Sequence, residues 1–351
     1  MEAKADLPFA PRWPCAKAAV RALGCALEPV GVDARKRRQR QQGPKKLVHL
    51  GVSILNRRSC AEPPHPMSPN PGPDPHPRPP RLRLPPGACD CHAHAFGPRD
   101  RYPLILSPGY VPAAVTLDDY LKMLHTLGVS RGVLVQPSPY GTDHAALLDA
   151  LRSRRFPLRG VALYNEALTD RQLETLHYYG VQGARLHILP DNATAVIAAL
   201  PRTAERVRAF GWHLQFYVNA AQHPDLDRRL LALPVPAVID HFGLVPAAGG
   251  TDSAGFQMLL RLARSGRCWF KLSAPYRISK ESPGFADVVP LARALVAAAP
   301  DRCLWGTDWP HPNASFIPND GDLVDLLADW IPDEALRNRV LVDNPAQLYG
   351  F

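Results

Sequence analysis

From residue 87 onwards, short apolar runs rich in Val, Ile and Leu alternate with longer stretches whose apolar residues recur every three or four positions. The short runs are typical of parallel strands covered on both faces, and the longer stretches have the period of amphipathic helices. The pattern predicts eight strands, at residues 88–92, 132–136, 159–163, 183–187, 213–218, 237–241, 268–273 and 303–307. Helices are expected between them, at residues 117–127, 143–152, 170–178, 195–210, 224–231, 254–265, 285–298 and 321–330.

Eight strand–helix pairs within residues 87–351 match the number and size expected of a (β/α)8 TIM barrel, which has about 250 residues. An open, doubly wound sheet has the same alternation. It favours a Gly-rich phosphate loop after its first strand, however, and none follows residues 88–92. The sequence therefore predicts an α/β fold, a TIM barrel, over residues 87–351.

The first 86 residues lack this alternation of strand-like and helix-like patterns. Residues 61–86 contain 12 prolines, which rule out a helix or a central strand there because proline lacks a backbone N–H. Residues 1–60 show no sustained period, and the apolar residues at 18–27 make a poor signal peptide because Arg21 interrupts them. We expect residues 1–86 to form a disordered Pro- and Arg-rich extension outside the folded domain.

The charge of the chain is concentrated in this extension. The formal net charge is +9, but residues 1–86 hold 16 Lys and Arg against 6 Asp and Glu, and the rest holds 25 against 26. A neutral body argues against a nucleic-acid surface, and the basic run at 35–40 lacks interleaved aromatic residues. A non-enzymatic protein that binds nucleic acid or a partner through the extension is the rival hypothesis. Retention of activity by residues 67–351 alone would discriminate against it.

Other features of the composition narrow the class of protein. The chain has no run of 18 apolar residues, so no transmembrane helix is expected. Its seven cysteines have no paired spacing, which argues against a disulfide scaffold and suits a reducing, cytoplasmic setting. Four of them lie on predicted strands: Cys89, Cys91, Cys268 and Cys303. Strand alternation turns Cys89 and Cys91 away from His92, so we expect small buried hydrophobes rather than metal ligands.

The residues that end the predicted strands carry the candidate chemistry, because a TIM barrel holds its active site at the C-terminal ends of its strands. The first strand runs into His92 and His94, which share a face because alternate strand residues point the same way. The sixth ends at His241, and the eighth runs into Asp308. A single strand-end His is commonly structural, but a buried carboxylate needs a partner. The four together predict a catalytic or metal-binding centre.

Longer motifs surround these residues, among them GACDCHAHAFGP at the first strand, VPAVIDHFG at the sixth and LWGTDWPHPN at the eighth. On these and the matching motifs at the other strands, residues 87–351 resemble the amidohydrolase superfamily, in its amidohydrolase-2 branch. Within that branch they are similar to the 2-pyrone-4,6-dicarboxylate lactonase group. GTDWPHPN is the most specific of the motifs.

The resemblance implies roles for the four strand-end residues. Asp308 would be the general base for an attacking water and later a proton donor, which requires a nearby cation to keep it ionised. The imidazoles of His92, His94 and His241 would either hold a divalent cation with Asp308 or polarise a lactone carbonyl. Members of the superfamily differ on this point, so we expect no metal or one, zinc if it is present. Residues 183–187 lack the Lys that bridges two metals in binuclear relatives.

The resemblance also implies a substrate pocket. Its expected members are Ser138, Tyr140, Arg185, Tyr217, Arg277 and His311. Arg suits a substrate carboxylate, and Arg185, inside an apolar strand, needs an anion. Two cationic anchors of the lactonase group are replaced here, by Asp191 and by Leu244, although His187 and His144 could compensate in part. A monocarboxylate or less charged lactone is therefore favoured over a dicarboxylate.

Together, these inferences predict a hydrolase that opens a lactone of a small carboxylated molecule in aromatic or sugar-acid catabolism. A metal-dependent decarboxylase and a lactone isomerase of the same superfamily are the alternatives. The expected partner is a small carboxylated lactone, with no nucleic acid and no membrane, and homo-oligomerisation is left open.

Overall fold

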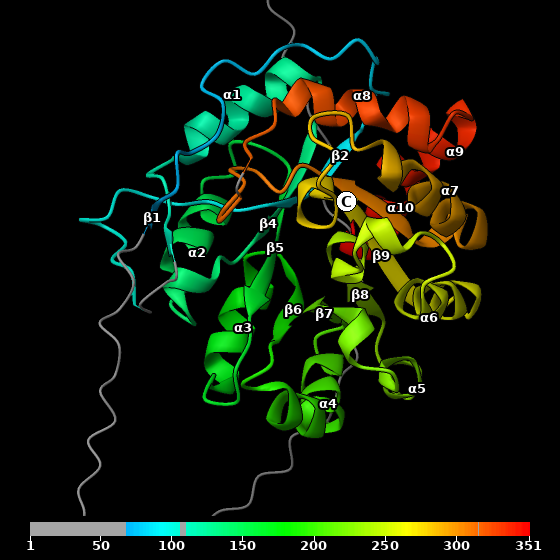
Figure 1. The fold of residues 1–351 in the computed structure, drawn as a ribbon. Coiled ribbons are helices and arrows are strands. Elements are labelled where there is room, and N and C mark those ends of the chain that lie inside the picture. Colours follow the sequence, from blue (N-terminus) through cyan, green and yellow to red (C-terminus); the bar gives the residue numbers. More distant parts are fainter. Residues whose placement is uncertain (1–67, 106–109, 315) are drawn as a thin grey trace, which may run out of the picture. The chain divides into compact units, whose positions relative to one another are not determined.

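The computed structural model describes residues 68–105, 110–314 and 316–351, and its central feature is a ring of parallel strands (Figure 1). The strands pair in sequence order: β2 (Cys89–Ala93), β4 (Arg131–Val135), β5 (Leu158–Leu163), β6 (Val181–Ile188), β7 (His213–Val218), β8 (Ala237–Ile239), β9 (Cys268–Ser273) and β10 (Cys303–Gly306). Two backbone hydrogen bonds complete the ring beyond β10. The Asp308 N–H donates to the His92 carbonyl (2.8 Å), and the His94 N–H to the Trp309 carbonyl (2.7 Å). The predicted TIM barrel is confirmed.

Helices follow the strands and surround the ring (Figure 1). They are α1 (Leu117–Leu127), α2 (Ala145–Arg152), α3 (Asp170–Tyr178), α4 (Ala193–Arg208), α5 (Leu226–Leu231), α6 (Ala254–Arg264), α7 (Val289–Ala298), α8 (Asp320–Trp330), α9 (Glu334–Asn338) and α10 (Asn344–Tyr349). Local sequence sets their ends: a capping box between Thr116 and Asp119 begins α1, and Gly128, with φ 76°, ends it. Within the described residues, no helix is long and apolar enough to cross a membrane.

One difference from the predicted elements that bears on the site lies at the sixth strand. β8 ends at Ile239, whereas the pattern predicted a strand to residue 241. His241, Phe242 and Leu244 have φ values of 49°, 52° and 51°, so the chain leaves the strand in a tight left-handed turn. This turn places His241 at the rim of the barrel.

The barrel has two apolar layers, one between strands and helices and one inside the ring. On β4, Leu134 packs in the outer layer, and Val133 and Val135 pack in the inner one, which also takes residues from β2, β5, β8, β9 and β10. Cys89 and Cys91 belong to this inner layer, and the register of β2 shifts between Asp90 and Ala93, so His92 faces inward as well. The expectation that these cysteines face away from the side of His92 was therefore wrong, since a bulge breaks the alternation.

All four strand cysteines are buried free thiols, as expected of small hydrophobes. Burial raises the pKa of the Cys303 thiol and raises that of Cys268 to about 12, so both stay protonated and unreactive at neutral pH.

The segment from residue 68 to residue 86 packs on the barrel. Its strand β1 (Ser68–Pro69) pairs with β3 (Tyr110–Val111), and Arg78 and Arg81 form ion pairs with Asp322 and Asp325 on α8. Leu82 and Leu84 pack against the outer apolar layer. The expected domain boundary at residue 87 thus needs correction for this segment, because an extended Pro-rich chain can dock through its side chains. Residues 1–67, with the basic run at 35–40, lie outside the described residues.

Candidate active site

Three imidazoles converge on one carboxylate oxygen at the C-terminal end of the barrel. The Nε2 atoms of His94, His92 and His241 lie 3.3, 3.6 and 3.7 Å from Oδ1 of Asp308. All four side chains are buried. The structure therefore brings together the four strand-end residues that the sequence singled out, although their catalytic role stays a prediction.

The two oxygens of Asp308 have different surroundings. Oδ2 accepts hydrogen bonds from the Tyr276 hydroxyl (2.7 Å) and from Nε and Nη2 of Arg277 (2.9 and 2.7 Å). Oδ1 has no hydrogen-bond partner among the described residues. Burial alone would raise the pKa of Asp308, but Arg277 and the imidazoles outweigh it and hold the pKa well below its usual range. One oxygen is thus anchored, and the other is an ionised acceptor facing the imidazoles.

The hydrogen bonds of the imidazoles decide which ring nitrogen faces Asp308. Nδ1 of His94 lies 2.9 Å from the Val135 carbonyl, which can only accept, so Nδ1 carries the proton. Burial lowers the pKa of His94, and it lowers that of His241 to about 3, so both rings are neutral at neutral pH. Nε2 of His94 therefore directs a lone pair at the ionised Oδ1 of Asp308.

Two acceptors that face each other at 3.3 Å require a donor or a cation between or beside them. Ligand atoms of His92, His241 and Asp308 all lie within 4.8 Å of one another, which suits one divalent ion. Nε2 of His92 and Oδ1 of Asp308 have no hydrogen-bond partner among the described residues. The donor set thus fits a single metal ion, and it also fits a tightly held water.

A second layer of buried charges lies behind His92. Its Nδ1 is 3.3 Å from both Oδ1 of Asp240 and Nζ of Lys271. Lys271 donates to Oε1 of Gln215 (2.8 Å), and Asp240 accepts from Nε of Arg185 (2.9 Å) and from the Gln215 amide (3.1 Å). Burial lowers the pKa of Lys271. Burial alone would raise the pKa of Asp240, but His92, Arg185 and Lys271 outweigh it and hold that pKa well below its usual range.

The sequence interpretation missed three members of this layer: Asp240, Lys271 and Gln215. A signal was present, because Lys271 interrupts an otherwise apolar strand two residues before Ser273, and alternate strand residues share a face. Ser273 confirms that face, since its Oγ lies 2.8 Å from Nδ1 of His241.

A cavity of about 170 Å³ opens beside the free oxygen of Asp308. Four of the six expected pocket residues line it, namely Ser138, Arg185, Tyr217 and Arg277, and so do His187 and Asn313. Asn313 had not been expected there.

The other two expected pocket residues do not line the cavity. The Tyr140 hydroxyl accepts a hydrogen bond from the Gly97 N–H (3.2 Å). His311 is buried between the Tyr276 hydroxyl, 3.1 Å from its Nδ1, and Asp320, 3.3 Å from its Nε2.

Of the two histidines expected to compensate for the missing cationic anchors, only one lines the cavity. His187 lines the cavity, whereas Nε2 of His144 contacts the Leu163 carbonyl at 3.0 Å and lies outside it. Asp191 and Leu244, at the positions of the replaced anchors, are not among the lining residues.

Both arginines that line the cavity form ion pairs with carboxylates of the protein itself. Arg185 was expected to need a substrate anion, but Asp240 already neutralises it. Arg277 is held by Asp308 and by the Pro312 carbonyl, 2.8 Å from its Nη2. Of the three guanidinium nitrogens of Arg185, only Nε has a hydrogen-bond partner among the described residues. Its Nη groups are therefore the free donors that a substrate anion would meet.

Comparison with known proteins identifies the family of this chain. Residues 89–351 match the family model described as amidohydrolase. The chain is 39% identical to 4-sulfomuconolactone hydrolase of Hydrogenophaga intermedia over 76% of its own length and 89% of the relative's. It is 37% identical to 2-pyrone-4,6-dicarboxylate hydrolase of Comamonas testosteroni (76% and 90%), and 31% identical to D-galactarolactone isomerase of Agrobacterium fabrum (76% and 91%).

Solved structures give the same picture. A protein of Agrobacterium tumefaciens, solved without ligand, superposes with a TM-score of 0.70 at 32% identity, covering 78% of this chain and 98% of the other. A second, from Acinetobacter baumannii, is described as a probable 2-pyrone-4,6-dicarboxylic acid hydrolase with citric acid bound. It gives a TM-score of 0.65 at 25% identity, over 76% and 100% of the two chains. With a matching model over most of its length and these relatives, the chain belongs to the amidohydrolase family.

Proposed function

We propose that this protein hydrolyses a lactone of a small carboxylated molecule. The observation that carries the proposal is the free, ionised Oδ1 of Asp308, which faces three imidazoles beside a cavity containing the free guanidinium edge of Arg185. The names of the relatives support it, since two are lactone hydrolases, one is a lactone isomerase, and a structural neighbour holds citric acid, a carboxylate.

The residues of the site suggest how the reaction proceeds. Asp308 accepts a proton at Oδ1 from a water that attacks the lactone carbonyl, and the ring C–O bond then breaks. The leaving oxygen takes the proton back from Asp308, so that no net charge is left on the enzyme. Tyr276 and Arg277 hold the other oxygen, which keeps the carboxylate ionised and aimed at the water.

A carboxylate whose pKa is held low is a weak base, so its water must be made more acidic. A divalent ion held by His92, His241 and Asp308 would supply that acidity when bound. We propose zinc as this ion, because imidazole and carboxylate ligands suit it. Metal analysis of the purified protein, with activity before and after chelation, tests this assignment.

We propose a monocarboxylate as the substrate. Each arginine pairs with a carboxylate of the protein, but Arg277 uses Nε and Nη2 in its contacts whereas Arg185 uses only Nε. The Nη groups of Arg185 are therefore the donors left to bind a substrate carboxylate, and a cavity of about 170 Å³ admits a small molecule. Arg185→Met should reduce kcat/KM for a lactone acid by about 30- to 1,000-fold, the cost of truncating a buried charge pair. It should have much less effect on the methyl ester of the same lactone. Equal losses on acid and ester would contradict the anchor.

Isomerisation and decarboxylation are distinguished from hydrolysis by the fate of water oxygen. In H₂¹⁸O, lactone hydrolysis places one ¹⁸O in the new carboxylate of the product. A lactone isomerase that does not open the ring with water would incorporate no ¹⁸O. A decarboxylase would release CO₂. Mass spectrometry of the product separates the three. An unlabelled product of unchanged mass would replace the proposed hydrolase with the isomerase named by one relative.

A further inference from the structure

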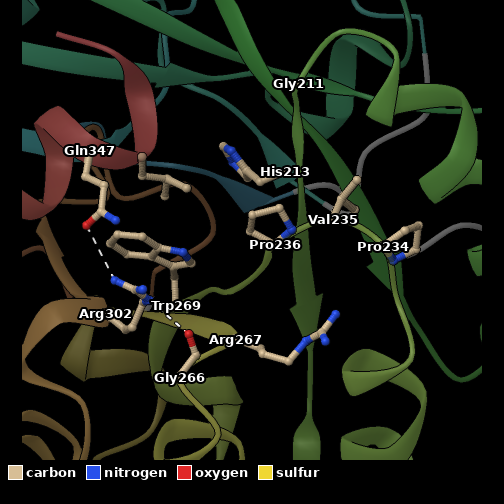
Figure 2. A pocket seen from close by; sticks show the side chains of 11 residues that line it. Gly211, His213, Pro234, Val235, Pro236, Gly266, Arg267, Trp269, Arg302 and Gln347 are labelled. Carbon is tan, nitrogen blue, oxygen red and sulfur yellow. Dashed lines mark hydrogen bonds between the residues drawn. The ribbon is translucent and has the colours of Figure 1, made fainter.

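A second cavity, of about 410 Å³, lies at the opposite end of the barrel from Asp308. Figure 2 shows this cavity from close by. Its lining comes from the starts of β7 and β9, the residues just before β8 and β10, and helix α10. The candidate active site uses the other ends of these strands. His213 lines this cavity and Tyr217 lines the one beside Asp308. These two residues of β7 are four steps apart, which corresponds to about 13 Å, so the two cavities are separate.

His213, the first residue of β7, lines this cavity with its polar atoms unused. It shares the inward face of β7 with Gln215 and Tyr217, and it is 2% exposed. Neither of its ring nitrogens has a hydrogen-bond partner among the described residues, and the same holds for the Tyr349 hydroxyl, whose ring lies 5.5 Å from the His213 ring. Leaving a buried imidazole without a partner costs free energy, so His213 adds a polar group to an otherwise apolar end of the barrel.

Gly183 on β6 makes room for this imidazole. A Cβ atom at Gly183 would lie 2.3 Å from Nε2 of His213, so any larger residue there would displace the ring. The local sequence therefore accommodates a buried imidazole at the end of the barrel away from the proposed chemistry.

Two guanidinium groups border the same cavity without carboxylate partners among the described residues. Arg267 donates to the Leu233 carbonyl at 2.7 Å. Arg302 donates to the Gly266 carbonyl at 3.0 Å and to Oε1 of Gln347 at 3.4 Å (Figure 2). These acceptors are neutral, so both positive charges are uncompensated. By contrast, Arg261 on the neighbouring helix α6 pairs with a carboxylate.

The remaining walls of the cavity are flat and apolar. The guanidinium of Arg302 lies 4.8 Å from the centre of the Trp269 ring, and Pro234, Pro236 and Leu348 line the other parts. Figure 2 shows Trp269 and Arg302 together on one side of the opening, with Arg267 on another. A planar hydrocarbon suits such walls, and an anionic group suits the guanidinium groups.

We propose that this cavity is a second binding site, for a small planar organic carboxylate. The carboxylate would accept hydrogen bonds from Arg302 or Arg267, and the flat part would lie along Trp269 and Pro236. The site is independent of the proposed hydrolysis, because none of its residues lines the cavity beside Asp308.

The test uses the full chain labelled with ¹⁵N at tryptophan, with benzoate as the probe and benzyl alcohol as its neutral isostere. The indole signal of Trp269 is identified by its loss in Trp269→Phe. We expect benzoate, and not benzyl alcohol, to shift this signal saturably. Arg302→Met and Arg267→Met should each weaken the apparent affinity about tenfold, the usual scale for one charge-assisted contact. Arg267 is exposed, so its variant should fold even if Arg302→Met does not.

Two control variants show whether the shift of the Trp269 signal arises from binding in this cavity. Arg264→Met removes an exposed arginine of α6 that does not line the cavity, and it should leave the titration unchanged. Arg185→Met disables the proposed carboxylate anchor of the active site, and it should also leave the Trp269 titration unchanged. Absence of a saturable shift, an equal shift with benzyl alcohol, or loss of the shift in Arg185→Met would each overturn the proposal. None of these outcomes depends on whether lactone hydrolysis is found.

Discussion

At the scale of single residues, the site depends on the different environments of the two carboxylate oxygens of Asp308. Three donors from Tyr276 and Arg277 hold Oδ2, and Oδ1 faces neutral imidazoles. The backbone of Asp308 has a φ of 63°, in the left-handed region that Asp tolerates better than most residues. The geometry is thus set by a few contacts whose removal has distinct consequences.

Asp308→Asn tests the proposed base directly. The amide keeps the size of the side chain and removes its basicity, so kcat for lactone hydrolysis should fall at least ~100-fold, the lower range for loss of a general base. The matched control is Asp191→Asn, which changes an exposed carboxylate outside the cavity. Circular dichroism should show both variants folded. Turnover near that of the wild type in Asp308→Asn would remove this residue from the mechanism.

Arg277→Met tests the ion pair that holds the pKa of Asp308 low. Without the guanidinium, burial favours the protonated acid, so the pKa of Asp308 rises. A base must be deprotonated to act, so the acidic limb of the kcat/KM profile should move to higher pH. The measurement is a pH–rate profile of both proteins from pH 4 to 9. An unshifted limb with a raised KM would instead mean that Arg277 mainly binds substrate.

Lys271→Met tests the layer behind His92. The substitution leaves Asp240 with Arg185 and Gln215 but takes away a buried cation, so unfolding free energy should fall by roughly 3–5 kcal/mol. The control is Lys122→Met, at an exposed lysine of α1 that lies outside this layer. Urea denaturation compares the two variants with the wild type. If Lys271→Met loses no more stability than the control, the buried cation is not part of what holds the layer together.

At the scale of elements, the segment at residues 68–86 is the part that the sequence placed wrongly. Its ion pairs with α8 are exposed and contribute little, so the half-buried Leu82 and Leu84 and the Asn70 amide, 3.1 Å from the His311 carbonyl, carry its docking. This last contact reaches the loop that holds Asp308.

Two truncations separate the packed segment from the rest of the extension. Removal of residues 1–66 should leave Tm and kcat/KM unchanged, because residues 68–86 keep their contacts. Removal of residues 1–86 should lower Tm by about 4–8 °C, since two partly buried leucines contribute ~1 kcal/mol each and each kcal/mol shifts Tm by about 2–4 °C. Calorimetry compares the two proteins. Equal Tm values would show that the segment is dispensable.

At the scale of the whole barrel, the site joins the first and last strands. His92 lies on β2 and His94 follows it, Asp308 follows β10, and two backbone hydrogen bonds connect the two segments. The proposed catalytic geometry therefore exists only when the ring is closed.

Activity should accordingly be lost together with the fold. In a urea titration of the chain at residues 67–351, the midpoint of activity loss should coincide with the midpoint from far-UV circular dichroism, as in a two-state transition. Loss of activity at clearly lower urea would show instead that the junction of β2 and β10 opens before the rest of the barrel.

The sequence by itself determined the alternation of strands and helices and the four polar residues at the strand ends. Periodicity is a local property, and in a parallel barrel all strand ends meet at one rim, so His92, His94, His241 and Asp308 could be brought together without knowing any contact.

Only the tertiary structure decided which charges meet across the strands. Arg185 with Asp240, Arg277 with Asp308, and Lys271 with Gln215 are pairs far apart in the chain, and no pattern specifies their partners. The bulge in β2 that places His92 on the same side as Cys89 and Cys91 is likewise a matter of register between neighbouring strands. Pairing depends on how the packed barrel aligns its side chains, whereas the elements depend on the order of residues along the chain.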